Sequence, residues 1–171
     1  MITIGIVSVL WVIYGFKLAF GFEAESAWYG SISLSGLGSA VNSLTNNGGV
    51  YPIPLLVFAA FQLMFAVITP ALISGAIADR AKFFSWGIFV ALWSTIVYFP
   101  VAHWVFAFGN KVGDSITGAG FLAAKGVEDF AGGTAVHINA GAAGLALAIV
   151  LGRRVGWRKE AMRPHSLPLV L

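Results

Sequence analysis

Four long apolar runs constrain this sequence more than any other feature. They cover about residues 1–21, 52–78, 83–108 and 132–152. Each is close to the roughly 20 residues that an α-helix needs to cross the hydrocarbon core of a bilayer. With 58% hydrophobic and only 10% charged residues, the chain is far more apolar than an ordinary soluble domain. The sequence therefore predicts an all-α integral membrane protein, a polytopic bundle of transmembrane helices.

The end of the chain carries the start of a further apolar run. This stretch begins at about residue 166 and ends with the sequence, which is too short for a span. Residue 1 already lies within an apolar run, without the charged segment and cleavage site of a signal peptide. We therefore expect residues 1–171 to form a single partial transmembrane domain, a fragment of a longer bundle.

The links between the apolar runs differ in positive charge. Links 79–83 and 153–166 are rich in Lys and Arg, whereas links 22–51 and 109–131 hold only Lys111 and Lys125. Because Lys and Arg are enriched in cytoplasmic loops, the first two links are predicted to be cytoplasmic and the other two external. The basic residues thus reflect topology and not nucleic-acid binding, and the predicted location is the cytoplasmic membrane, crossed several times.

A histidine lies in the fourth apolar run, which the string VEDFAGGTAVHINAG (127–141) introduces. Steps of three or four residues from His137 define a helix face made of small residues, namely Gly133, Ala140, Gly141, Gly144 and Ala148. Such a face is expected to meet another helix closely. The imidazole either bonds two helices together or lines a pathway between them, since ionisable groups within a membrane commonly serve function.

An acid precedes the same run. Asp129 is predicted to cap the free N–H groups of the first helical turn, near the positive end of the helix dipole. Alternatively, or in addition, its charge attracts cations to the external surface.

Aromatic and proline residues mark the second and third runs. Phe61 and Phe65 are four residues apart and share a helix face, which suits lipid contact and packing, or holding a cation and closing a narrow pore. Pro70 and Pro100 are expected to kink their helices.

His103 is expected to form a hydrogen bond at the outer membrane interface.

Motifs for other functions are absent from the sequence. It contains no Walker loop, no H-E-x-x-H and no G-x-S-x-G. Cysteine is absent, and three scattered histidines do not predict a metal or haem site. We therefore expect no enzyme, no metal and no cofactor.

Three strings on successive runs resemble the ammonium transporter (Amt/Mep/Rh) family. They are FQLMFAVITPALISGAIADR, YFPVAHWVF and DFAGGTAVHINAGAAGL. The resemblance implies an eleven-helix fold assembled as a homotrimer with one pore per subunit. This chain is similar to helices two to five and the start of helix six.

The resemblance also implies roles for individual residues. Phe61 and Phe65 resemble a stacked pair at the outer end of the pore, with Phe65 as the inner gate and part of a cation-π site. Phe106 occupies a position where the family usually has tryptophan, Asp129 resembles an acid near that site, and His137 resembles the first of two pore histidines. The implied mechanism is recruitment of ammonium, its deprotonation, and passage of ammonia along a hydrophobic pore lined by histidine.

Two alternatives stay open beside an ammonium channel or transporter. One is an ammonium sensor on the same scaffold, and the other is a structural helix bundle in which His137 only joins helices. The second pore histidine and a serine of the recruitment site fall outside this sequence. Ammonium or ammonia, the lipid bilayer, further copies of the chain and a cytoplasmic regulatory protein are the partners to consider.

Overall fold

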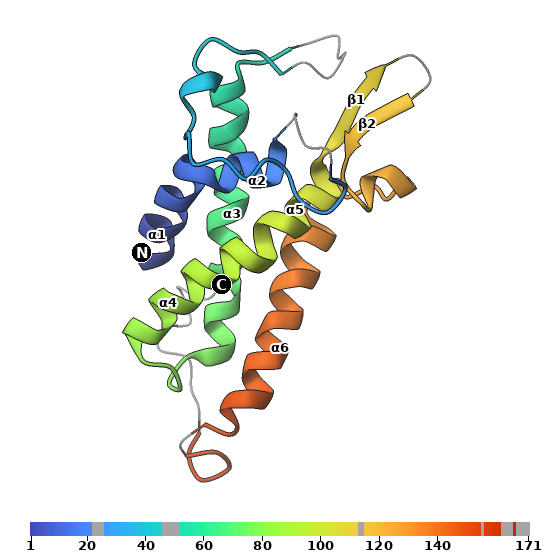
Figure 1. Ribbon diagram of the computed structural model, residues 1–171. Coiled ribbons are helices and arrows are strands. Elements are labelled where there is room, and N and C mark those ends of the chain that lie inside the picture. The colour runs from blue at the N-terminus through green and yellow to red at the C-terminus, as the bar shows by residue number, and fades with distance from the viewer. Residues whose placement is uncertain (22–25, 46–51, 113–114, 155, 162–165, 167–171) are drawn as a thin grey trace.

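The computed structural model describes residues 1–21, 26–45, 52–112, 115–154, 156–161 and 166, and it is built mainly of helices (Figure 1). Within the described residues, four helical segments are long and apolar enough to cross a membrane: Ile2–Phe20, Leu55–Ile77, Phe83–Phe106 and Gly133–Leu151. Their ends differ from the apolar runs by at most three residues. The expected membrane helix bundle is confirmed, whereas the apolar stretch that follows residue 166 lies outside the described residues.

Three of these segments contain a π-helical turn. The first comprises α1 (Ile2–Leu10), the π turn η1 (Trp11–Gly15) and α2 (Phe16–Phe20). The third comprises α4 (Phe83–Trp93), the π turn η3 (Ser94–Tyr98) and α5 (Phe99–Phe106). The fourth begins with the π turn η5 (Gly133–Ile138) and continues as α6 (Asn139–Leu151). Such turns take up one extra residue and redirect the helix, and they are frequent at functional sites.

The two prolines affect their helices differently. Helix α3 (Leu55–Ile77) continues through Pro70 without interruption, so the expected kink does not break it. Just before this proline, the Thr69 hydroxyl donates to the carbonyl oxygen of Phe65 at 2.6 Å. Pro100 is the second residue after the π turn η3, where the wider hydrogen-bonding pattern departs from the regular α-helix.

The core lies where the first and third segments pack with α3. The indole N–H of Trp11 donates to the carbonyl oxygen of Ala59 on α3 at 3.0 Å, so the one polar atom of this buried ring has a partner. The Phe99 ring lies 5.6 Å from the Trp11 ring, measured between centroids. A Cβ at Gly15 would lie only 2.6 Å from the Phe99 ring, so a glycine is needed for this close approach.

A β-hairpin stands beyond the end of α5, in the link that the sequence presented only as glycine-rich. Strands β1 (Phe108–Val112) and β2 (Ser115–Ala119) pair in antiparallel register, with Phe108 opposite Ala119. Two short 3-10 turns complete the described elements, η2 (Gly38–Ala40) and η4 (Ala123–Lys125).

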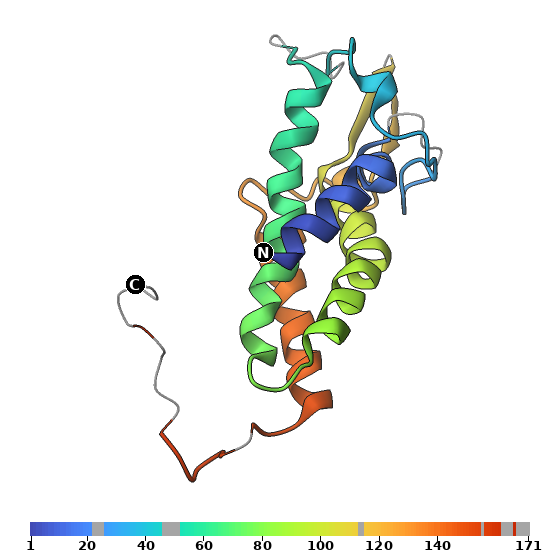
Figure 2. The same ribbon diagram turned by 90° about the vertical axis from the view of Figure 1, so that its left-hand side faces the viewer.

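Helices α3 and α6 lie side by side and run in the same direction, as Figures 1 and 2 both show. Among the described elements, these two share the most extensive contact. A Cβ built on Gly144 would lie 3.4 Å from the Cβ of Ala76, so the small residue allows the two backbones to approach. Helix α3 carries two residues of the candidate site, Phe61 and Phe65, and α6 continues from the turn that carries His137.

Candidate functional site

Asp129 caps the turn that opens the fourth span. Its Oδ1 accepts a hydrogen bond from the N–H of Gly133 at 2.6 Å, and its Oδ2 accepts bonds from Thr134 and Ala135 at 2.9 and 3.0 Å. Gly132, in the left-handed region at φ 75°, lets the chain turn into the helix. The predicted cap is confirmed, and a negative charge lies at the positive end of this helix.

His137 lies one turn into the same segment, within η5, and its side chain is exposed. The helix face expected around it is shifted. The residues of this segment that are buried against the bundle include Val136, Ala140 and Gly144. Gly141, like His137, is exposed. The contact is shifted because the side chains of Val136 and the partly buried Leu147 bury more apolar surface than a strip of glycine.

Phe61 and Phe65 contact each other one turn apart on α3. Their ring centroids are 5.1 Å apart and the ring planes meet at 75°, so the two rings are arranged edge to face. This geometry is favourable for two aromatic rings because the positive edge of one meets the negative face of the other. Phe61 is 58% exposed, whereas Phe65 packs partly against the core.

Phe106 and Trp104 belong to different clusters at the end of α5. Phe106 is half-buried against the core. The indole N–H of Trp104 donates to the carbonyl oxygen of Trp28 at 2.7 Å, and its ring also neighbours Phe121. The rings of Trp28 and Phe121 stack at 4.6 Å, with the Lys125 ammonium 4.0 Å from the centroid of Phe121. Trp104 is thus engaged in an aromatic cluster that does not include Phe106.

His103 is fully buried in the last turn of α5, and its ring forms the hydrogen-bond contacts expected of it at the outer end of this span. Its Nδ1 lies 2.9 Å from the carbonyl oxygen of Ala19, and its Nε2 lies 3.1 Å from that of Ser26. A Cβ on Gly120 would lie 1.9 Å from the carbonyl oxygen of His103, so only glycine fits there. The sequence did not reveal the two partners of the ring, because Ala19 and Ser26 are 84 and 77 residues away along the chain and follow no periodic spacing.

The candidate residues stand on segments that contact one another. Helix α3 bears Phe61 and Phe65, α5 ends at Phe106, and η5 bears His137 and follows Asp129. Both α3 and α5 contact η5. Among the described residues, no group of three or more His, Cys, Asp or Glu side chains could hold a metal ion. The arrangement combines aromatic rings, one carboxylate and one imidazole.

Comparison with known proteins decides the family. The family model described as Ammonium Transporter Family matches residues 1–171. The chain belongs to the ammonium transporter family. It is 50% identical to an ammonium transporter of Mycobacterium bovis and 39% identical to ammonium transporter Amt1 of Archaeoglobus fulgidus, in each case over 99% of the chain.

Solved ammonium transporter structures share the fold. The crystal structure of Saccharomyces cerevisiae Mep2 matches 89% of this chain with a TM-score of 0.68 at 32% identity, and this chain covers 31% of that one. The G343C mutant of Candida albicans Mep2 matches 97% of this chain with a TM-score of 0.72 at 27% identity, and 34% of that chain is covered.

The chain spans 38% of the length of both curated ammonium transporters named above. More than half of each relative therefore has no counterpart among these 171 residues. Family membership and the four apolar helices together establish a multi-pass membrane protein.

Proposed function

We propose that the protein, at its full natural length, is an ammonium channel or transporter. Membership of the ammonium transporter family across the whole chain is the observation that carries this proposal. The curated relatives are named transporters, which favours transport over an ammonium sensor or a purely structural bundle.

We propose that ammonium is first held at the outer end of α3. The exposed ring of Phe61 and the adjoining Phe65 offer aromatic surface to a cation. Asp129 adds negative potential, because a carboxylate that accepts backbone hydrogen bonds still carries its charge. Phe106, on the neighbouring α5, is the third aromatic residue proposed for this recruitment site.

Deprotonation would follow, with the proton accepted by the imidazole of His137 or by water at the outer surface, and neutral ammonia would pass His137. A bare ammonium ion would lose its hydration in a dry apolar pathway, at a cost of several kcal/mol or more, whereas ammonia loses far less. An imidazole can donate and accept hydrogen bonds, so His137 can bond ammonia on its way. The π turn under His137 supports this role, because such turns are frequent at functional sites.

We further propose that the protein lies in the cytoplasmic membrane and acts as a homotrimer. The location rests on the uneven distribution of Lys and Arg between the links. The trimer and a cytoplasmic regulatory protein rest on the family resemblance alone.

Uptake of radiolabelled methylammonium tests the proposal. The protein at full natural length is expressed in cells that lack their own ammonium transporters. We expect uptake by the wild type, and a loss of roughly ten-fold or more in His137→Asp and Phe65→Ala, because each removes a contact on the proposed pathway. Phe84→Ala is the control, since Phe84 is 77% exposed at the opposite end of the bundle.

Three results would contradict the proposal in different ways. Absence of uptake by a correctly inserted wild type would favour the sensor. Normal uptake in both pathway variants would remove those residues from the mechanism. If His137→Ala assembles poorly but each inserted molecule transports methylammonium normally, the histidine serves only as a contact between helices.

A further inference from the structure

Two helices end next to each other at the predicted cytoplasmic side of the bundle. Helices α3 and α6 run in parallel, so their C-termini, at Ile77 and Leu151, lie at the same end. A helix leaves its last four carbonyl groups without partners inside the helix, and its C-terminus carries partial negative charge. Two such ends side by side repel each other unless positive groups lie between them.

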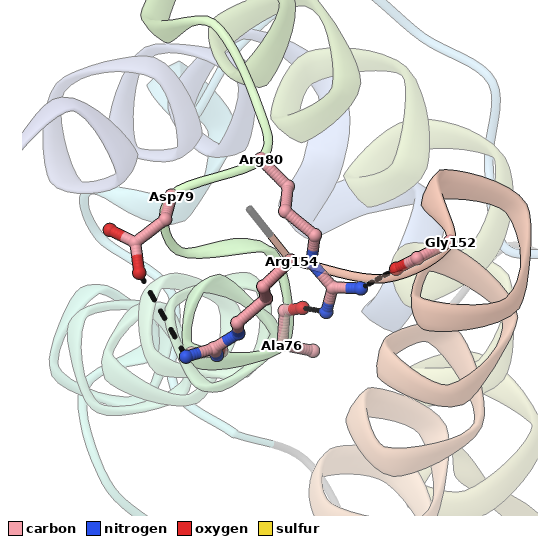
Figure 3. Close-up of polar contacts among 6 residues, drawn as sticks. Ala76, Asp79, Arg80, Gly152 and Arg154 are labelled. Carbon is pink, nitrogen blue, oxygen red and sulfur yellow. Dashed lines mark hydrogen bonds and ion pairs between the residues drawn. The ribbon is translucent and has the colours of Figure 1, made fainter. Parts of the chain in front are cut away.

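Arg80 joins the two ends. One terminal nitrogen of its guanidinium donates to the carbonyl oxygen of Gly152, just after α6, and the other donates to the carbonyl oxygen of Ala76 in the last turn of α3 (Figure 3). The flat guanidinium presents its donors in a fixed fork. One side chain thereby sets the distance between two helix ends.

Arg154 makes the reciprocal connection. It follows α6 in the chain, yet it donates to the carbonyl oxygen of Gly75 on α3 at 3.2 Å. Its other terminal nitrogen lies 3.9 Å from a carboxylate oxygen of Asp79. Arg80, which follows α3, thus bonds the end of α6, and Arg154, which follows α6, bonds the end of α3. Figure 3 shows the bonds of Arg80 and the ion pair of Arg154 with Asp79.

The backbone at both helix ends is shaped for these contacts. Asp79 has a φ of 67° and Gly152 a φ of 71°, so the chain takes a positive φ two residues after α3 and directly after α6. For an aspartate this conformation is uncommon, and it persists where surrounding contacts support it. The ion pair of Asp79 with Arg154 is one such contact.

We propose that Arg80 and Arg154 are positioning residues that hold α3 and α6 in fixed axial register. The register matters because α3 bears Phe65 and α6 continues from the turn that bears His137. A slip of one residue would move one set of groups by about 1.5 Å along the bundle axis. The consequence for transport rests on the proposed function, whereas the helix register itself does not.

Disulfide cross-linking measures the register directly. The Cβ of Ala76 and a Cβ built on Gly144 are 3.4 Å apart, close to the span of a disulfide, and the chain has no cysteine of its own. In membranes containing the full natural length protein, Ala76→Cys with Gly144→Cys should cross-link rapidly. Adding Arg80→Gln should slow the cross-link about ten-fold, because hydrogen bonds from a charged donor are lost.

Matched variants separate the arginine contacts from charge alone. Arg80→Lys keeps the charge but loses the fork, so an intermediate rate is expected. Arg154→Gln should slow the cross-link as Arg80→Gln does. It replaces Arg80→Gln in the experiment if that variant does not insert into the membrane. Arg153→Gln is the control, because Arg153 is the exposed neighbour in sequence. A rate in both Arg80→Gln and Arg154→Gln equal to that of Arg153→Gln would overturn the proposal.

Transport then tests the consequence. Arg80→Gln should lower the maximal rate of methylammonium uptake about ten-fold and change its KM less, since Phe61 and Phe65 both stand on α3 and keep their contact with each other. Forming the disulfide in the Arg80→Gln protein should restore uptake. Failure of this rescue would refute the positioning role. If His137→Asp and Phe65→Ala also transport normally, the proposed function fails instead, and the cross-linking result still stands.

Discussion

The Nδ1 atom of His103 lies 2.9 Å from the carbonyl oxygen of Ala19, so a buried imidazole fastens the third span to the end of the first. The other ring nitrogen lies 3.1 Å from the carbonyl oxygen of Ser26, which belongs to the link that follows the first span. One side chain therefore organises the outer end of the bundle.

His103→Ala should lower thermal stability strongly. It removes the ring N–H that donates to one of the two carbonyl groups, at a cost of about 1–3 kcal/mol where that carbonyl stays buried, and it also removes the packing of the ring. Thermal unfolding in detergent measures the effect, with Trp104→Phe as the control that removes a single, more exposed hydrogen bond. Equal unfolding temperatures for the two variants would contradict the organising role of His103.

Asp129→Ala should destabilise the start of the fourth span by about 1–2 kcal/mol, the range for loss of an N-terminal cap. Asp129→Asn should retain only part of the cap. Both carboxylate oxygens of Asp129 accept hydrogen bonds from backbone N–H groups, whereas the side-chain NH2 of asparagine cannot accept one. Hydrogen exchange of the backbone amides in η5 measures the loss. Glu128→Gln removes the same charge from the neighbouring exposed position and should leave exchange unchanged.

Phe106→Trp should improve the affinity for methylammonium. Tryptophan binds cations more strongly than phenylalanine does, so a gain of about 0.5 kcal/mol would lower KM roughly two-fold. Uptake kinetics measure the change. Trp104→Phe should leave KM unaltered, because Trp104 is engaged with Trp28 and Phe121. A KM that rises or stays constant in Phe106→Trp would count against Phe106 as part of the recruitment site.

Gly144→Val should separate α3 from α6, whereas Gly141→Val should have little effect. Both changes place the same side chain in the same helix, so helix propensity cancels. A Cβ at Gly144 already meets Ala76 at 3.4 Å, but one at Gly141 has no atom within 4 Å among the described residues. We expect a difference of about 1–3 kcal/mol, typical of an overpacked contact, in thermal unfolding. Equal stability of the two variants would contradict the close approach.

Local sequence signals predicted the features that depend on neighbouring residues. The apolar runs gave the four helices to within three residues, because the thickness of a bilayer sets the length of a span. The cap by Asp129 followed from its place just before a helix that begins with glycine. The helix lengths and the cap can both be predicted from a short stretch of sequence.

Features that depend on distant residues were predicted poorly. The ring nitrogens of His103 lie at hydrogen-bond distance from carbonyl groups 84 and 77 residues away, and no spacing in the sequence predicts these contacts. The face of α6 was shifted because the packed surface follows the bulk of Val136 and Leu147 and not the glycines. The hairpin β1–β2 was missed, although a Gly-Asp pair between two short runs is a recognised hairpin signal.

The π turn η5 makes the fourth span tolerant of a length change at one place. Removing a residue between Gly133 and Val136 would let this turn relax into a regular α-helix, with the cap before it and α6 after it still in phase. The same deletion within Ala140–Val150 would rotate one part of the helix by about 100° against the other. Variation in length among natural versions of this helix is therefore expected at the π turn, ahead of His137.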